Sequence, residues 1–101
     1  MALVRAMCKA KVPEGKICEV RVNRKSLAVA NVDGKPCVIS NICTHEQGPL
    51  GRGVLEGTVV TCPWHEWKFD VTSGKLLNAQ GEGVKTYPAE VQGEDIFVDL
   101  D

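Results

Sequence analysis

The chain lacks several features that would point to particular functions. Its 101 residues carry a formal net charge of −1, so it lacks the strongly basic surface on which nucleic-acid binding depends. No apolar run is longer than four residues, which is too short to span a membrane. The first residues also lack the apolar core of a secretory signal. We therefore expect a cytoplasmic protein with no nucleic-acid or membrane partner.

The composition is otherwise that of one ordinary globular domain. Hydrophobic residues make up 44% and charged residues 25%, and a chain of this length has room for one core, so residues 1–101 are expected to form a single domain. The charge is unevenly spread. Residues 1–36 hold eight Lys and Arg against three acids, whereas residues 37–101 hold four bases against ten acids. Such an uneven spread of charge is typical of either an ordinary solvated surface or an acidic face that docks a partner.

The chain also lacks any stretch with a sustained helical period, so no long helix is expected. Short runs rich in Val, Ile and Thr alternate with glycine-containing turns, which predicts an all-β fold. Asp33-Gly34 predicts a type I′ hairpin turn. Residues 48–57 hold four of the ten glycines together with Pro49, and we expect a loop there. The expected strands are residues 3–8, 16–22, 26–32, 36–41, 58–61, 67–70, 84–91 and 96–100.

Histidine is scarce, and its placement is informative. The two histidines each follow a cysteine, in Cys43-Thr44-His45 and Cys62-Pro63-Trp64-His65. Five cysteines, an odd number, without an export signal do not suggest a disulfide framework. Two turns that each supply one thiolate and one imidazole can hold either a tetrahedral zinc ion or a 2Fe–2S cluster. Because each turn mixes the two ligand types and no helix follows, the spacing favours the cluster.

The motifs around these residues resemble those of a known family. Gly48-Pro49-Leu50, Trp67, Phe69-Asp70 and Ser73-Gly74-Lys75, together with the two Cys/His motifs, resemble the Rieske iron–sulfur proteins. More narrowly, the chain is similar over nearly its whole length to the small Rieske-type ferredoxins of bacterial ring-hydroxylating dioxygenase systems. The resemblance implies stacked antiparallel sheets and a small cluster-binding subdomain of two loops, within about residues 41–75.

The resemblance also implies the cofactor, the ligands and the role. The cofactor would be one 2Fe–2S cluster of the Rieske type, a metal centre with Cys43 and Cys62 on the buried iron and His45 and His65 on the outer iron. The chain would be an electron-transfer protein rather than an enzyme, with no catalytic residues. It would make transient contacts with a flavin-containing reductase and a terminal oxygenase.

Several positions depart from the respiratory branch of the family. That branch has a disulfide between the ligand loops at the positions of Gly48 and Trp64, and hydroxyl donors at those of Trp67 and Phe69. The departures point to the ferredoxin branch and to a low reduction potential. Glu66 stands where that branch often has glycine.

Two other functions remain open on sequence grounds. The chain could be the small Rieske subunit of an NAD(P)H-dependent nitrite reductase or a similar oxidoreductase, or a non-redox zinc-binding module. Trp64 and Trp67 are expected to pack around the cluster and exclude water. The remaining cysteines match no ligand position and are expected to be buried or half-buried structural thiols: Cys8, Cys18 and Cys37.

Overall fold

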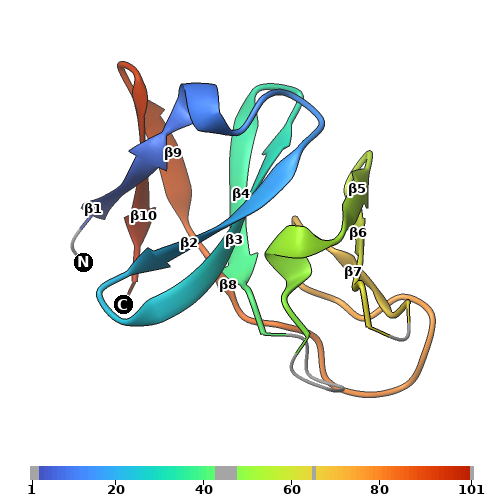
Figure 1. Ribbon diagram of the computed structural model, residues 1–101. Coiled ribbons are helices and arrows are strands. Elements are labelled where there is room, and N and C mark those ends of the chain that lie inside the picture. Colours follow the sequence, from blue (N-terminus) through green and yellow to red (C-terminus); the bar gives the residue numbers. More distant parts are fainter. Residues whose placement is uncertain (1–2, 43–47, 65, 101) are drawn as a thin grey trace.

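The fold is built almost entirely from antiparallel strands (Figure 1). The structure, a computed structural model, describes residues 3–42, 48–64 and 66–100. Within these ranges it contains ten strands and two short 3-10 turns, which confirms the expected all-β class. None of the helical turns in these ranges is long and apolar enough to cross a membrane.

The strands form three sheets. The first sheet has the order β1-β10-β9, and its strands are Leu3–Cys8, Asp95–Asp99 and Ala89–Gln92. The second has the order β2-β3-β4-β8, with strands Ile17–Val22, Lys25–Val32, Lys35–Ser40 and Thr86–Tyr87. The third has the order β5-β6-β7, with strands Val54–Glu56, Val59–Thr61 and Lys68–Asp70. The turns are η1 (Lys9–Lys11) and η2 (Leu50–Arg52).

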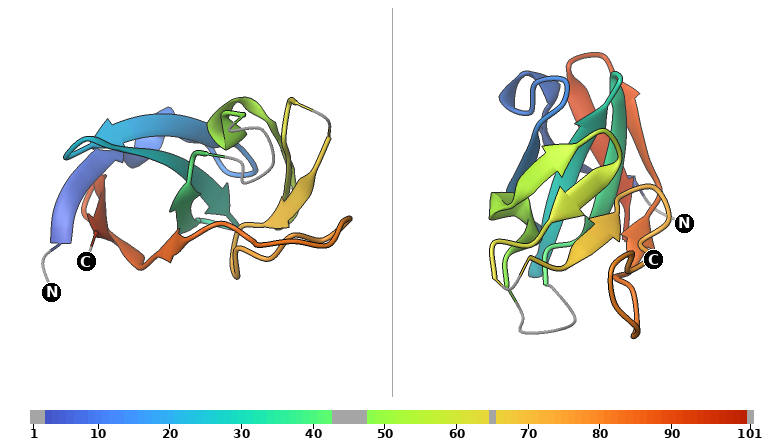
Figure 2. Two further views of the ribbon diagram at one scale, coloured as in Figure 1. Left: turned by 90° about the horizontal axis from the view of Figure 1, so that it is seen from below. Right: turned by 90° about the vertical axis from the view of Figure 1, so that its right-hand side faces the viewer.

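The arrangement of the strands is seen from two further sides in Figure 2. Side chains of the second sheet contribute to two hydrophobic cores, one on each of its faces. Successive side chains of a strand point to opposite faces. Leu27 and Val29 of β3 therefore pack toward the first sheet, with Ile96 and Val98 of β10. Ala28 and Ala30 pack toward the third sheet. This double burial explains why residues 27–30 are uniformly apolar, because a strand buried on both faces has no polar alternation.

Two tight turns connect the strands of this central sheet. Asp33 and Gly34 have φ values of 52° and 85°, as a type I′ turn requires, so the predicted hairpin is confirmed. Asn23 and Arg24 form a second turn with positive φ values of 48° and 69°. This second turn was not predicted from the sequence, because arginine at its second position carries no turn signal.

Two of the expected segments are wrong. Residues 48–57 are not a continuous loop, since η2 and β5 lie within them and β5 pairs with β6 through a turn at Gly57. Residues 84–91 are not one strand either. Pro88, which has no N–H to donate, separates β8 from β9, and the two join different sheets.

Candidate functional site

The residues on either side of the first Cys/His motif are paired with each other next to the end of β4. Cys43 and His45 lie outside the described residues. The residues on either side of them form an antiparallel bridge between Ile42 and Pro49, and the Leu50 N–H donates to the Asn41 carbonyl oxygen at 2.8 Å. The residues before the motif are therefore paired with the residues after it. We call residues 42–49 the first ligand loop.

The second motif begins where β6 ends. His65 lies outside the described residues, but Cys62, Trp64 and Glu66 are described. The Cys62 N–H donates to the Trp67 carbonyl oxygen at 2.7 Å, which closes this turn, and the Trp64 N–H donates to the Cys62 Sγ at 3.4 Å. We call residues 62–67 the second ligand loop.

Glu66 has a φ of 57°, in the left-handed region that side chains other than glycine and asparagine rarely adopt. The neighbouring Asn78 fixes this part of the second ligand loop. Its Nδ2 donates to the Glu66 carbonyl oxygen at 3.1 Å, and its Oδ1 accepts from the Lys68 N–H at 2.9 Å. The positive φ gives a physical reason for the glycine expected at this position in the ferredoxin branch.

The two ligand loops lie against each other at Gly48. A Cβ placed on Gly48 would lie 2.8 Å from the Cys62 Sγ and 3.1 Å from the Trp64 Cβ and Cγ, so no side chain fits there. Positions 48 and 64 are therefore neighbours across the loops. A disulfide requires two such neighbouring positions. The closeness of positions 48 and 64 therefore agrees with their match, made from the sequence, to the two disulfide cysteines of the respiratory branch.

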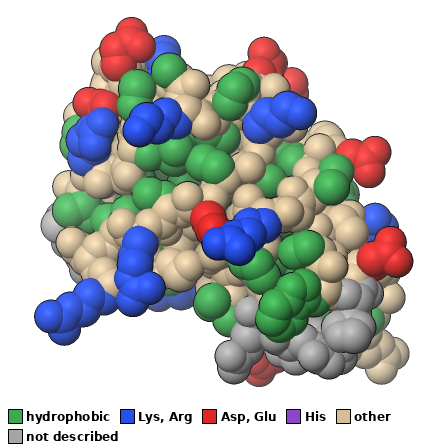
Figure 3. All heavy atoms as spheres, viewed as in Figure 1, with side chains coloured by type: hydrophobic (Ala, Val, Ile, Leu, Met, Phe, Trp, Pro, Cys, Tyr) green, Lys and Arg blue, Asp and Glu red, His purple; other side chains and the backbone are tan. Residues whose placement is uncertain are grey.

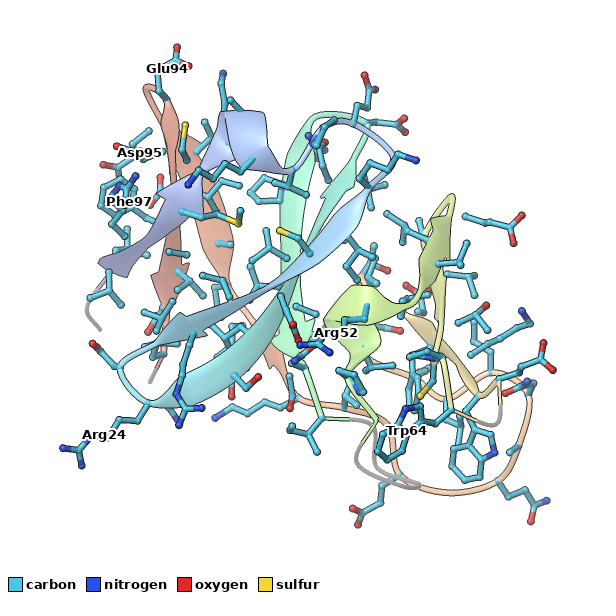
Figure 4. All side chains as sticks on the ribbon, in the orientation of Figure 1. Arg24, Arg52, Trp64, Glu94, Asp95 and Phe97 are labelled. Carbon is cyan, nitrogen blue, oxygen red and sulfur yellow. The ribbon has the colours of Figure 1, made fainter. Side chains whose placement is uncertain are left out.

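The two tryptophans differ in burial, and this difference was not predicted from the sequence. Trp67 packs partly buried against the core shared by the second and third sheets. Trp64 is 50% exposed, and its base contacts the Gly48 position while much of its surface faces solvent (Figure 4). The packing of both rings around a cluster stays a prediction.

The described part of the site fits a cofactor held between the two loops. The Cys62 thiol is 1% exposed and lies in the core with Leu50, Val60 and Phe69, so one side of the site is apolar. Its sulfur already accepts a backbone N–H, as a metal-bound thiolate does in many sites. Two soft thiolates and two imidazoles are a donor set for a mixed-ligand iron–sulfur cluster.

The other described cysteines lie in strands, as expected. Cys8, Cys18 and Cys37 are partly buried free thiols in β1, β2 and β4. Burial is the main cause that raises the pKa of the Cys18 and Cys37 thiols, which disfavours the reactive thiolate. The structural role expected for these cysteines agrees with their half-buried positions.

The comparisons with known proteins agree with this geometry. Residues 2–88 match the Rieske [2Fe-2S] domain family. The ferredoxin component of the naphthalene 1,2-dioxygenase system of Pseudomonas aeruginosa is 36% identical over 98 residues, which cover 96% of this chain and 94% of that protein. A Sphingomonas yanoikuyae B1 ferredoxin structure is 31% identical, with a TM-score of 0.89 over 99% of this chain and all of that chain.

A second similar structure is a chain from the complex of reduced oxygenase and oxidized ferredoxin in carbazole 1,9a-dioxygenase. It is 26% identical, with a TM-score of 0.86, and the match covers 95% of this chain and 91% of that chain. These relatives are electron carriers rather than catalytic components. The chain described here belongs to the Rieske [2Fe-2S] domain family, as a ferredoxin that carries electrons with one 2Fe–2S cluster.

Proposed function

We propose that the chain accepts electrons from a flavin-containing reductase and passes them to the terminal oxygenase of a dioxygenase system. The relatives named as dioxygenase ferredoxins and the structure of such a ferredoxin with its oxygenase support this role. The observation that carries the proposal is the closeness of Gly48 to Cys62, since a Cβ on Gly48 would lie 2.8 Å from the Cys62 Sγ and the two ligand loops therefore lie side by side. Free thiols at Cys8, Cys18 and Cys37 support a reducing, cytoplasmic location.

The ligands in this proposal are Cys43, His45, Cys62 and His65, and the cluster-binding portion spans about residues 41–75. The bound cluster supplies one-electron chemistry. The chain's own residues hold the two loops side by side and make the buried side apolar through Phe69 and Leu50.

The surface beside the ligand loops suits brief contacts with partners. Ile42 and Trp64 are 43% and 50% exposed, and each is next in the chain to a proposed ligand. Figure 3 shows hydrophobic side chains gathered at this end of the molecule. Small apolar groups surrounded by polar surface are typical of contact sites that must form and separate repeatedly.

The first test is the identity of the bound metal. Purified protein should be red-brown and contain about two irons per chain, because two thiolates and two imidazoles hold a 2Fe–2S cluster. After reduction with dithionite, the EPR signal should be rhombic, with an average g below that of all-cysteine clusters. Changing either His45 or His65 to alanine should remove the cluster. A colourless protein with one zinc ion after anaerobic purification would contradict the proposal.

The second test addresses the contact between the ligand loops. Gly48→Ala should reduce the iron content and shift the visible spectrum, because the new Cβ would lie 2.8 Å from the Cys62 Sγ. Gly57→Ala is the matched control. A Cβ there meets nothing within 4 Å, although the φ of 62° makes the substitution cost about 1 kcal/mol. Equal iron contents in the two variants would show that the loops do not need this contact.

The third test is the reduction potential. We expect a value near about −150 mV, the low end of the Rieske range, because Trp67 and Phe69 provide no hydroxyl to stabilise added negative charge. Phe69→Tyr should raise the potential by about 20–60 mV if the new hydroxyl donates to a cluster sulfur, the equivalent of one hydrogen bond. Tyr87→Phe, which removes a hydroxyl in the other core, should leave it unchanged. A midpoint above about +100 mV by voltammetry would refute the expectation.

The fourth test asks whether acidic groups beside the histidines steer a partner. Glu46 and Glu66 each follow a ligand histidine in the sequence, and Glu66 is exposed. Replacing both with glutamine should slow reduction by a flavin-containing reductase mainly at low salt, since the Debye length falls from ~10 Å at 0.1 M to ~3 Å at 1 M.

Glu94→Gln is the control for this test, because Figure 4 shows Glu94 at the far end of the molecule from Trp64. It removes one negative charge without touching the site. If the rate and its salt dependence are the same in all three proteins, the two glutamates do not steer the reductase.

A further inference from the structure

Asn41 is a buried polar residue whose role was not predicted from the sequence. It follows β4, lies two residues before Cys43 and is only 3% exposed. A buried amide is costly unless its donors and acceptor are paired. The partners of Asn41 therefore indicate what it does.

Its side chain joins three elements of the fold. The Nδ2 donates to the Glu19 Oε2 of β2 and to the Ser26 Oγ of β3, both at 3.0 Å. The Oδ1 accepts from the Gly51 N–H of η2 at 2.6 Å. Because Gly51 contributes a donor, it determines which end of the amide carries the oxygen.

The far end of the first ligand loop is held to the same point. Arg52 follows Gly51, and its Nε donates to the Glu19 Oε1 at 2.6 Å (Figure 4). The Arg52 and Asn41 hydrogen bonds lower the pKa of the Glu19 carboxyl, so this group stays ionised near neutral pH. Gly51 itself packs against β2, since a Cβ on it would lie 2.6 Å from the Glu19 Cβ.

We propose that Asn41 is a positioning residue that fixes both ends of the first ligand loop relative to the central sheet, and with them Cys43 and His45. This inference rests on the proposed ligand set. Asn41 directly precedes the loop, and its side chain holds Gly51, just past the loop's end. Without this amide, the two ends of the loop would be joined only by the Ile42–Pro49 bridge and the backbone hydrogen bond from Leu50 to Asn41, so the first pair of ligands would be held less firmly relative to the central sheet.

The experiment exchanges the donor and the acceptor of the Asn41–Glu19 pair. In Asn41→Asp, two carboxylates would face each other at the 3.0 Å contact. In Glu19→Gln, the new amide has to turn a donor toward either Arg52 or Asn41, both of which are donors. In the double variant, the new amide at position 19 can donate to the new carboxylate at position 41, while the oxygen of that amide still accepts from Arg52. The double variant also keeps the net charge of the native chain.

The readouts are the half-life of the cluster's visible absorbance in the presence of an iron chelator and the linewidth of the EPR signal. Each single variant should shorten the half-life about fivefold and broaden the signal, since fivefold corresponds to about 1 kcal/mol, the value of one hydrogen bond. The double variant should recover most of the native half-life. If Asn41→Asp does not fold, the comparison of Glu19→Gln with the double variant still decides the question.

Asn31→Asp is the matched control. Asn31 makes the same kind of bridge, donating to the Val12 carbonyl oxygen at 3.0 Å and accepting from the Gly34 N–H at 2.8 Å, in a hairpin outside both ligand loops. It should lower the thermal stability but change the cluster half-life less than twofold.

The inference is overturned if Asn31→Asp shortens the cluster half-life as much as Asn41→Asp does. It is also overturned if the cluster half-life of the double variant is no longer than that of Glu19→Gln. Its failure is distinguishable from that of the proposed function. If the native chain holds no 2Fe–2S cluster, the proposed function is refuted. If the native chain holds the cluster but substitution of Asn41 does not change the cluster half-life, only the positioning role is refuted.

Discussion

The lack of room for a side chain between Gly48 of the first ligand loop and Cys62 and Trp64 of the second is the constraint on which the site depends. No atom beyond hydrogen fits at position 48, because the Cys62 Sγ and the base of Trp64 already fill the space where a Cβ would lie. Two loops separated by β5 and β6 therefore meet within van der Waals distance. The third sheet, which connects them, packs through Val60 and Phe69 on the central sheet, so the contact has a rigid support on its buried side.

The two ligand loops are held in place by different sets of hydrogen bonds. The first is tied at its base by a network around the buried Asn41 amide, in which Asn41 and Glu19 connect the central sheet to η2. The second is held by more exposed hydrogen bonds from Asn78 and by the left-handed conformation of Glu66. Hydrogen bonds to a charged group contribute more than those between neutral groups, and only the network beside the first loop contains a charged partner, the Glu19 carboxylate.

The features that could be predicted from the sequence are those determined by residues close together in the chain. The Asp33-Gly34 turn, most strand positions and the two Cys/His motifs all follow from local patterns. Asn23-Arg24 and β5 were missed because their conformations depend on the strands they connect or pair with. Pro88 could have marked the end of β8, since a proline within a predicted strand is itself a warning. Asn41 carried no local signal, because its partners Glu19 and Ser26 lie 22 and 15 residues away.

Phe69 connects the fold to the chemistry of the site. It is fully buried in the core that also contains Cys62, so its ring serves the packing of the third sheet on the second. The same ring offers no hydrogen-bond donor to the sulfur side of the site, and an apolar wall without donors disfavours any increase of negative charge nearby. Removing the ring would cost about 3–5 kcal/mol as a buried cavity, whereas a hydroxyl added to this fully buried ring would need both space and a hydrogen-bond partner among its neighbours. The packing and the electrostatics of the site are therefore coupled at this position.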